Sequence, residues 1–458
     1  MALQEPWHHT VDPFLPMQVF AAMGVPNTNT TTTQHALSFP RWNPPGNTTA
    51  GIPLDSILDY MQALAENKQP LYNHSPNFPE ASYRIDATNG ITVNAVQYEW
   101  THLAARHDRW VPTHRLMELA LERLEADTTN RWPQLHHVVH NGGFPLLLIH
   151  GDNRKCNDAY YWRTGTPLPV FTYAAPVTDR CRYAFPMPTY HMFLHSKESS
   201  AAWANVHAAT AAQYPWHTKR RQLIWRGTLW TDLPEDAVST RHVLLERFAA
   251  TGNKNNKNNN LLLDIHTTQI MDTSTFTPYT KNDTALVAQY GGLADPLPMP
   301  DFQQYRAILD VDGLSWSSRF VTLLCFNSVV LKVEPEFVDY FHGDVQPWVH
   351  YIPVASDLRD LEEMAAYAND PANDASIQRI IANANAWCHA RLVHSRLADD
   401  LLDTWSFYVD QLYNNDPQWQ DRWNRAQQNG TLLHEAHSLL ARDVIRMDEE
   451  QELAEESA

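Results

Sequence analysis

One group of residues suited to binding an anion follows a short apolar run at residues 222–225. Arg226 and Gly227 come directly after this run, and a basic run precedes it at residues 219–221. Ligands bind beyond the carboxyl ends of parallel strands, where a guanidinium can form paired hydrogen bonds with phosphate oxygens. Gly227 would let the backbone approach such a ligand. The pattern predicts that Arg226 binds a diphosphate; a structural salt bridge of Arg226 is the competing interpretation.

A second group lies where the strand pattern of residues 305–310 ends in a polar turn. It combines carboxylates, hydroxyls and a guanidinium: Asp310, Asp312, Gly313, Ser315, Ser317 and Arg319. Hydroxyls, an arginine and the backbone N–H groups that open a helix predicted over 320–326 would form a diphosphate cradle. Two other interpretations stay open for Asp310 and Asp312, which could bind a metal ion as a pair or could cap the turn.

A third group places aromatic side chains at the edge of a predicted strand, in residues 347–354. Trp348, His350 and Tyr351 could flank a nucleobase there. The same residue types are also typical of core packing, so this motif alone does not predict a ligand.

The elements that must position these groups follow an alternating pattern. Continuous apolar runs of strand length alternate with helical stretches, and the runs cover residues 144–150, 170–173, 222–225, 261–264, 305–310, 328–333 and 350–354. Continuous rather than alternating apolar character indicates strands covered on both faces. The sequence therefore predicts an α/β fold with parallel sheets and helices packed on either side.

Helices are predicted from apolar residues at three- and four-residue steps. They cover residues 54–65, 116–124, about 357–365, 377–392 and 398–412. Ser356 or Asp357 is expected to cap the third of these helices, because both residue types accept hydrogen bonds from the first backbone N–H groups. The first 50 residues, rich in Pro, Asn and Thr, are expected to form an extended arm, and residues 448–457 a solvated acidic tail.

Composition excludes several classes of protein. The formal net charge is -18 over 458 residues, which argues against a nucleic-acid partner because such surfaces need a basic stripe. No run approaches the length of a membrane span and no secretory leader is evident, so a soluble chain is expected. The four cysteines lack metal-site spacing, while a bridge between Cys156 and Cys181 stays open.

The order of the three motifs closely resembles glycosyltransferase family 90, which includes Rumi-type protein O-glucosyltransferases and fungal capsule-associated xylosyltransferases. The shared pattern is Trp-Arg-Gly, then Asp-Gly-x-Ser-x-Ser-x-Arg-Phe, then Ser-Val-Val-Leu-Lys and Pro-Trp-x-His-Tyr-x-Pro-Val. The resemblance is specific over residues 216–413 and looser over 135–188. It implies a GT-B fold, with two Rossmann-like domains facing a cleft, and inverting transfer from a UDP-sugar without an obligate metal ion or other cofactor.

The resemblance also assigns roles to individual residues. Arg226 and Arg319 match diphosphate-binding arginines, Ser317 matches a hydroxyl donor to the same group, and Arg241 matches an arginine that follows the Trp-Arg-Gly loop. Gly227, Asp312, Gly313 and Ser315 complete the predicted donor site. Asp152 falls in register with the catalytic base, although the family's neighbouring Arg is Gly151 here; a turn-capping role is the alternative.

These patterns together predict four regions and one function. The regions are an arm with a first helix over 1–80, an acceptor-side domain over 81–215, a nucleotide-sugar domain over 216–395, and C-terminal helices with a tail over 396–458. The function is transfer of glucose or xylose from a UDP-sugar to a glycan or protein hydroxyl. The alternatives are a silent UDP-sugar-binding or lectin-like protein and a metal-dependent transferase that uses Asp310 and Asp312. The resemblance implies the secretory pathway, whereas the sequence itself shows no entry signal.

Overall fold

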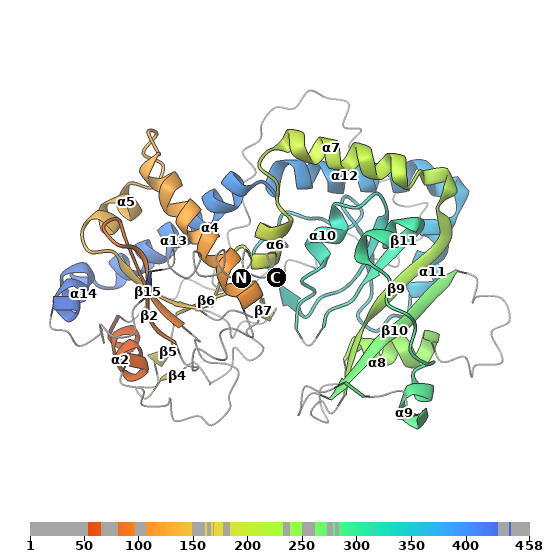
Figure 1. The fold of residues 1–458 in the computed structure, drawn as a ribbon, viewed down its shortest axis with the longest axis horizontal. Coiled ribbons are helices and arrows are strands. Elements are labelled where there is room, and N and C mark those ends of the chain that lie inside the picture. Colours follow the sequence, from red (N-terminus) through yellow and green to blue (C-terminus); the bar gives the residue numbers. More distant parts are fainter. Residues whose placement is uncertain are drawn as a thin grey trace, which may run out of the picture.

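The computed structural model describes residues 54–65, 81–96, 107–148, 161–162, 166–167, 169–176, 184–231, 239–249, 262–272, 278–279, 284–313, 315–428 and 439–440. These residues form a mixed α/β structure with two main sheets, one in each half of the molecule (Figure 1). The parallel strands and covering helices confirm the predicted α/β class. Among the helices of these ranges, none has an apolar stretch long enough to cross a membrane.

The N-terminal half contains a six-stranded sheet in the order β15-β2-β1-β3-β6-β8. Its strands are β1 (Ala81–Asp86), β2 (Gly90–Val96), β3 (Phe144–Leu148), β6 (Val170–Thr172), β8 (Ala184–Pro186) and β15 (Leu439–Leu440). Only β3, β6 and β8 pair in parallel; β1 pairs antiparallel with both β2 and β3. The β1–β2 hairpin was not predicted; its residues alternate polar and apolar side chains, unlike the continuous apolar runs of the predicted strands.

Helices cover this sheet and connect it to the second half. They are α2 (Leu54–Ala65), α4 (His107–Glu125), α5 (Pro133–His140), α6 (Tyr190–His195) and α7 (Ser200–Gln213). The helix predicted over 54–65 is confirmed. The helix predicted over 116–124 begins nine residues earlier, at His107, and includes Pro112. A short hairpin of β4 (Tyr161–Trp162) and β5 (Thr166–Pro167) lies apart from the main sheets.

The C-terminal half contains a five-stranded parallel sheet in the order β10-β9-β11-β12-β14. Its strands are β9 (Arg220–Thr231), β10 (Leu263–Asp272), β11 (Tyr305–Asp310), β12 (Val329–Val333) and β14 (Ile352–Val354). Side chains of β9, β11 and β12 are buried alternately in two separate hydrophobic clusters. The prediction of parallel strands covered on both faces is therefore confirmed for this sheet.

Two strands of this sheet extend further than predicted. β9 continues past Trp225 to Thr231, and β10 runs on to Asp272 rather than ending at Asp264. The β9–β11 pairing ends at Ile224, whereas the β9–β10 pairing continues to Thr231. Polar residues in this extension obscured the strand pattern in the sequence.

The order of the strands creates a switch point between β9 and β11. The chain passes from β9 to β10 on one side, then crosses back to β11 on the other side of β9. In open parallel sheets, ligands bind in the crevice outside the carboxyl ends of strands at such a position. The loops after β9 and β11 therefore define where a ligand should be sought.

Helices α8 (Thr240–Leu244), α9 (Thr284–Gln289), α10 (Phe320–Leu324), α11 (Leu361–Asn369) and α12 (Asp374–Arg391) belong to the C-terminal half. The predicted start of α11 was wrong, because neither Ser356 nor Asp357 caps it. Leu358 is fully buried with a φ of 59°, a left-handed conformation that interrupts a helix. The Asp360 carboxylate, at the start of α11, accepts a hydrogen bond from the Ala355 N–H at 3.0 Å.

The last helices return to the N-terminal half. Helix α13 (His394–Asn415) packs against α4 and α5, and α14 (Trp419–Gln428) follows it (Figure 1). The Tyr408 hydroxyl donates to the Pro145 carbonyl of β3 at 3.0 Å, and Trp405 packs edge-on against Phe144. The four domain ranges stay predictions, and the structure adds that the C-terminal helices complete the core of the second range.

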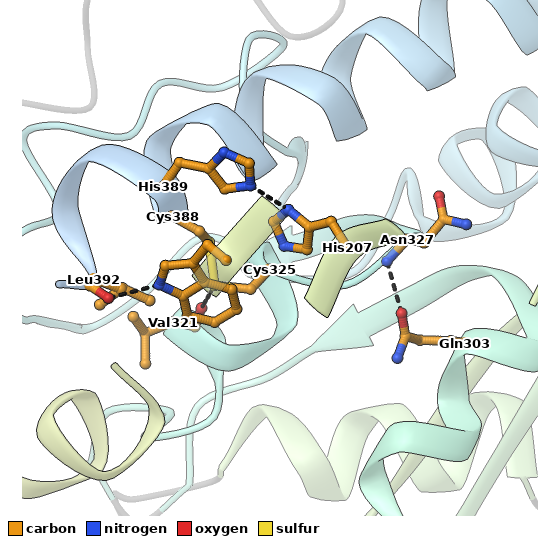
Figure 2. The surroundings of a disulfide bond; sticks show 9 residues. His207, Gln303, Val321, Cys325, Asn327, Cys388, His389 and Leu392 are labelled. Carbon is orange, nitrogen blue, oxygen red and sulfur yellow. Dashed lines mark hydrogen bonds between the residues drawn. A yellow bond between two sulfur atoms is a disulfide. The ribbon is translucent and has the colours of Figure 1, made fainter. Parts of the chain in front are cut away.

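A disulfide bond joins Cys325, at the end of α10, to Cys388 of α12, with Cα atoms 5.8 Å apart (Figure 2). Beside it, the ring nitrogens of His389 and His207 lie 2.7 Å apart, linking α12 to α7. The four cysteines are widely spaced, so the sequence gave no indication of this bridge. Cys156 and Cys181, whose pairing stayed open, lie outside the described residues.

Candidate functional site

Arg241 spans the switch point of the parallel sheet. Its guanidinium donates to the Thr228 carbonyl of β9 at 2.7 Å and to the Val311 carbonyl, directly after β11, at 3.0 Å. The group also lies over the buried Trp225 ring, 5.6 Å from its centre. Arg241 belongs to the short helix α8, which places its guanidinium beside β9 and the end of β11.

Arg319 reaches the same place from the loop that precedes α10. Its Nη1 atom donates to the Arg226 carbonyl of β9 at 2.5 Å, and its Nε atom lies 3.7 Å from an Asp310 carboxylate oxygen. The Nη2 atom is buried and has no hydrogen-bond partner among the described residues. Arg319 therefore retains donor capacity at the switch point.

The two guanidinium groups place concentrated positive charge at this site. Burial lowers the pKa of Arg241 to about 10, and the positive charge of Arg319 contributes to this effect. Burial also lowers the pKa of Arg319, which Asp310 partly offsets. An anion bound between the two groups would relieve their repulsion and form charge-assisted hydrogen bonds, as a diphosphate does.

Behind the arginines, Lys332 contacts two aspartates: Asp310, the last residue of β11, and Asp312, just beyond it. Its ammonium donates to Asp310 at 2.8 Å and to Asp312 at 2.7 Å, and its side chain is almost fully buried. Burial opposes the charge of Lys332, but the two carboxylates raise its pKa above the ordinary value. Burial also opposes the charge of Asp310, but Lys332 and Arg319 outweigh it and lower the pKa of Asp310. At Asp312 the effect of burial is larger than that of Lys332, so the pKa of Asp312 is raised.

This arrangement bears on the interpretation of Asp310 and Asp312 as metal ligands. The Lys332 ammonium stands between the two carboxylates, where a shared cation would bind, and the Glu336 N–H donates to Asp312 at 3.2 Å. No site role was predicted for Lys332 from the sequence. The available signal was a lysine within an otherwise apolar strand, since a buried lysine almost always has an acidic partner.

The side chain of Arg226 pairs with β10, whereas Arg241 and Arg319 meet at the switch point. Its guanidinium forms an ion pair with Asp264 of β10 at 2.6 Å and donates to the Asp264 carbonyl at 2.8 Å. The Tyr305 hydroxyl donates to the second Asp264 oxygen at 2.6 Å. These contacts correspond to the salt-bridge interpretation of Arg226. Arg226 contacts Arg319 through its backbone carbonyl, not through its side chain.

Gly227 makes room for Trp225. A Cβ atom at position 227 would lie 2.7 Å from Cζ2 of the Trp225 ring. Real Cβ atoms do not approach other atoms this closely, so a side chain here would displace the ring that supports Arg241. The expected approach of a ligand to the Gly227 backbone stays a prediction.

The remaining predicted donor residues surround the aspartates. The Ser317 hydroxyl is buried and donates to Asp310 at 2.5 Å, and Ser315 is also buried. A Cβ atom on Gly313 would stand 3.5 Å from Nη2 of Arg241, an ordinary contact distance. The end of β11 and the loop after it thus bring together Asp310, Asp312, Gly313, Ser317 and Arg319. Their binding of a diphosphate stays a prediction.

The third motif is used largely for packing. Tyr351 is buried, with its ring edge-on to Phe320 at 5.6 Å between centres, and Trp348 packs against Tyr367 at 5.7 Å. Nδ1 of His350 accepts a hydrogen bond from the Gln346 N–H at 2.9 Å. The core-packing interpretation describes these contacts. The proposed catalytic base, Asp152, lies outside the described residues.

A buried pair of titratable groups near Lys332 had no counterpart in the sequence analysis. The Asp339 N–H donates to Nδ1 of His342 at 2.8 Å, and both side chains are about 95% buried. Burial raises the pKa of Asp339 well above its usual value, against the effect of Lys332. Burial lowers the pKa of His342 to about 3, with Lys332 contributing. Neither residue belongs to a recognisable motif.

Two of the contacts between the halves bring the N-terminal half close to the site. The rings of Tyr173, directly after β6, and Trp316, in the loop after β11, have centres 6.4 Å apart. Strand β7 (Ala175–Pro176) pairs antiparallel with β13 (Phe337–Val338), joining the two halves. The carboxyl end of β6 therefore lies close to the arginine site.

Comparisons with known proteins agree with the motif order. A model of glycosyl transferase family 90 matches residues 106–428. Protein O-glucosyltransferase 2 from Danio rerio is 28% identical over 247 residues, covering 53% of this chain and 41% of that protein. Protein O-glucosyltransferase 3 from Rattus norvegicus is 26% identical over 252 residues, 54% of this chain and 41% of that protein. Protein O-glucosyltransferase 1 from Homo sapiens is 30% identical over 179 residues, 37% of each chain.

The extent of these matches defines what they establish. The chain spans about two-fifths of the length of the curated relatives it matches. The family model, in contrast, covers well over half of the 458 residues and includes the parallel sheet, the switch point and both arginines. This chain therefore belongs to glycosyl transferase family 90.

Proposed function

We propose that this protein transfers glucose or xylose from a UDP-sugar to a hydroxyl of a glycan or protein acceptor. The observation that carries the proposal is the convergence of Arg241 and Arg319 at the switch point, where buried Nη2 of Arg319 has donor capacity to spare. A diphosphate matches this pair in charge and in hydrogen-bonding geometry. The names of the matched relatives support glucose as the first donor sugar to test.

The proposal includes a two-domain GT-B arrangement. Residues 81–215 would form the acceptor side and residues 216–395 the nucleotide-sugar side. Two sheets joined by the β7–β13 pairing, with the carboxyl ends of β6 and β11 close together, support this division. A donor held by the C-terminal sheet would then face an acceptor held by the N-terminal half.

The proposed reaction is an inverting displacement. Asp152 accepts the proton of the acceptor hydroxyl, the acceptor oxygen forms a bond to the anomeric carbon, and the bond from that carbon to the diphosphate breaks. UDP leaves with the bonding electron pair. Arg241 and Arg319 stabilise the negative charge that grows on the diphosphate, which is the role that preorganised cations serve in such transfers.

We further propose that the reaction needs no metal ion. The positive charges of Arg241 and Arg319 supply what a divalent cation supplies elsewhere, and the Lys332 ammonium occupies the space between Asp310 and Asp312. The disulfide between Cys325 and Cys388 supports work in an oxidising compartment such as the secretory pathway.

The decisive experiment measures UDP release from UDP-glucose, UDP-xylose and their epimers, with glycan and peptide acceptors. We expect release from UDP-glucose or UDP-xylose that persists with a strong chelator. The variant Arg319→Ala should lose roughly tenfold or more in kcat/KM, because a charge-assisted hydrogen bond contributes about 1.5–3 kcal/mol. Arg425→Ala, at an exposed position of α14, serves as the matched control and should retain activity.

Other outcomes would identify the alternatives. Loss of activity with chelator, restored by a divalent cation, would contradict the metal-independent proposal and favour a role of Asp310 and Asp312 in metal binding. UDP binding without turnover across the acceptor panel would favour a silent donor-binding protein, as the Gly151 neighbour of Asp152 allows. Absence of both UDP binding and release would refute the proposal.

A further inference from the structure

Three side chains that commonly bind metal ions converge on the N-terminal half, where α4 ends and α5 passes beside it. Glu125 is the last residue of α4, and His136 and His140 belong to α5. Residues four apart lie on the same face of a helix. The two imidazole rings accordingly lie with their centres 4.3 Å apart.

The distances between the ligand atoms suit a small cation. One atom from each of Glu125, His136 and His140 lies within 4.8 Å of the other two, and the His140–Glu125 pair is already 3.0 Å apart. Ligand atoms around a tetrahedral zinc ion stand roughly 3.3 Å from one another. Glu125 and His140 are exposed and His136 is half-buried, so rotation of side chains suffices to close the site.

The surroundings favour a cation over an anion. Glu125 also lines a pocket between the β1–β2 turn and α4, whose lining includes Glu118, Glu122 and Asp86, the last paired with Arg84 at 2.7 Å. Clusters of one sign of charge raise the local concentration of the opposite ion. The Ala87 N–H donates to the Val139 carbonyl of α5 at 3.0 Å, which fixes the turn against the helix that carries both histidines.

We propose that Glu125, His136 and His140 bind one divalent transition-metal ion, with Zn²⁺ as the best match. Two imidazoles and one carboxylate suit zinc better than the all-oxygen sites that Mg²⁺ and Ca²⁺ prefer, and a water molecule would complete the four ligands. The ion joins the end of α4 to α5 and so closes the loop of residues 126–132. This site belongs to the N-terminal half and is independent of the proposed transferase reaction.

The test uses the full chain without a histidine tag, first stripped by a chelator and then titrated with Zn²⁺ by calorimetry. We expect one tight site per chain and a rise in Tm on Zn²⁺ addition, since a ligand that binds only the folded state stabilises it. His136→Ala and His140→Ala should each weaken that site at least roughly tenfold. His137→Ala, which removes an exposed histidine of the same helix, should leave the affinity unchanged.

A second measurement guards against a folding defect. Co²⁺ substituted into the wild-type site should give the intense visible absorption of a four-coordinate ion, and Glu125→Gln should weaken its binding while leaving Tm without metal unchanged. Absence of Zn²⁺ binding at micromolar concentrations in the wild-type chain would overturn the proposal. Equal loss of affinity in the His137 variant, or no loss in the His136 and His140 variants, would also overturn it.

Discussion

At the scale of single residues, Gly227 leaves room for the Trp225 ring that packs against the Arg241 guanidinium. We expect Gly227→Ala to push the Trp225 ring from beneath Arg241, because the new Cβ atom would stand 2.7 Å from it. Overpacking of this kind costs about 1–3 kcal/mol, so Tm should fall and the KM for the donor should rise. Gly313→Ala is the matched control for stability, because its Cβ would be in ordinary contact. Thermal unfolding of both variants and donor kinetics of Gly227→Ala provide the measurement. A Gly227→Ala protein as stable as Gly313→Ala would contradict the packing argument.

Arg226 and Arg319 provide a second comparison between single residues. Arg226 is paired with Asp264 at 2.6 Å, so Arg226→Gln should mainly lower stability, by about 1–3 kcal/mol. Arg319 has an Nη2 atom without a partner among the described residues, so Arg319→Gln should mainly lower kcat/KM for the donor. Urea denaturation and UDP-release kinetics on both proteins separate the two effects. The opposite result, with kcat/KM changed more at Arg226, would return the diphosphate role to that residue.

At the scale of elements, the disulfide between α10 and α12 stabilises the segment that follows Arg319. Its cysteines are 63 residues apart, and closing such a loop contributes up to about 4 kcal/mol in the chain-entropy account. The double variant Cys325→Ala with Cys388→Ala should therefore unfold at lower urea concentration and bind the donor less tightly, because α10 begins directly after Arg319. Using the double variant rather than a reductant leaves Cys156 and Cys181 untouched. An unchanged urea midpoint would show that packing alone holds α10 in place.

At the scale of the whole molecule, two buried groups should give the stability opposite dependences on pH. Burial lowers the pKa of His114, between Tyr83 and Trp110, to about 3. The unfolded chain binds a proton at this residue below its ordinary pKa of 6.5, so stability falls by about 1.4 kcal/mol per pH unit as pH drops from 6.5 towards 3. Burial raises the pKa of Asp400, on α13, to about 7, so the folded chain binds the extra proton and stability rises as pH drops from 7 towards 4.

Two variants separate these contributions. His114→Gln should make stability less sensitive to acid between pH 6.5 and 5, while Asp400→Asn should make it more sensitive over the same range. Urea denaturation at pH 7, 6 and 5 measures both. Parallel pH profiles for the two variants and the wild type would show that neither group titrates as its burial implies.

The parallel sheet and its loops could be largely predicted from the sequence. Strands such as β11 and β12 are continuous apolar runs because both faces are buried, and a one-dimensional pattern records this directly. The β1–β2 hairpin was missed although its alternating polar and apolar residues are a local strand pattern; only its pairing with the distant strands β3 and β15 needed the tertiary structure. The start of α11 was misplaced because Ser356 and Asp357 are good capping residues in general, while the buried turn at Leu358 is a tertiary feature.

The sequence by itself determined the family, the α/β class and the short list of residues that could bind a diphosphate, because motif order and residue type are local properties. Only the tertiary structure decided which members of that list meet. The pairing of β10 with β9 brings Asp264 within ion-pair distance of Arg226. Helix α8 and the loop before α10 bring Arg241 and Arg319 together, although 78 positions separate them in the chain. Lys332 acquired its role in the same way, since only the pairing of β12 with β11 places its ammonium between the two aspartates.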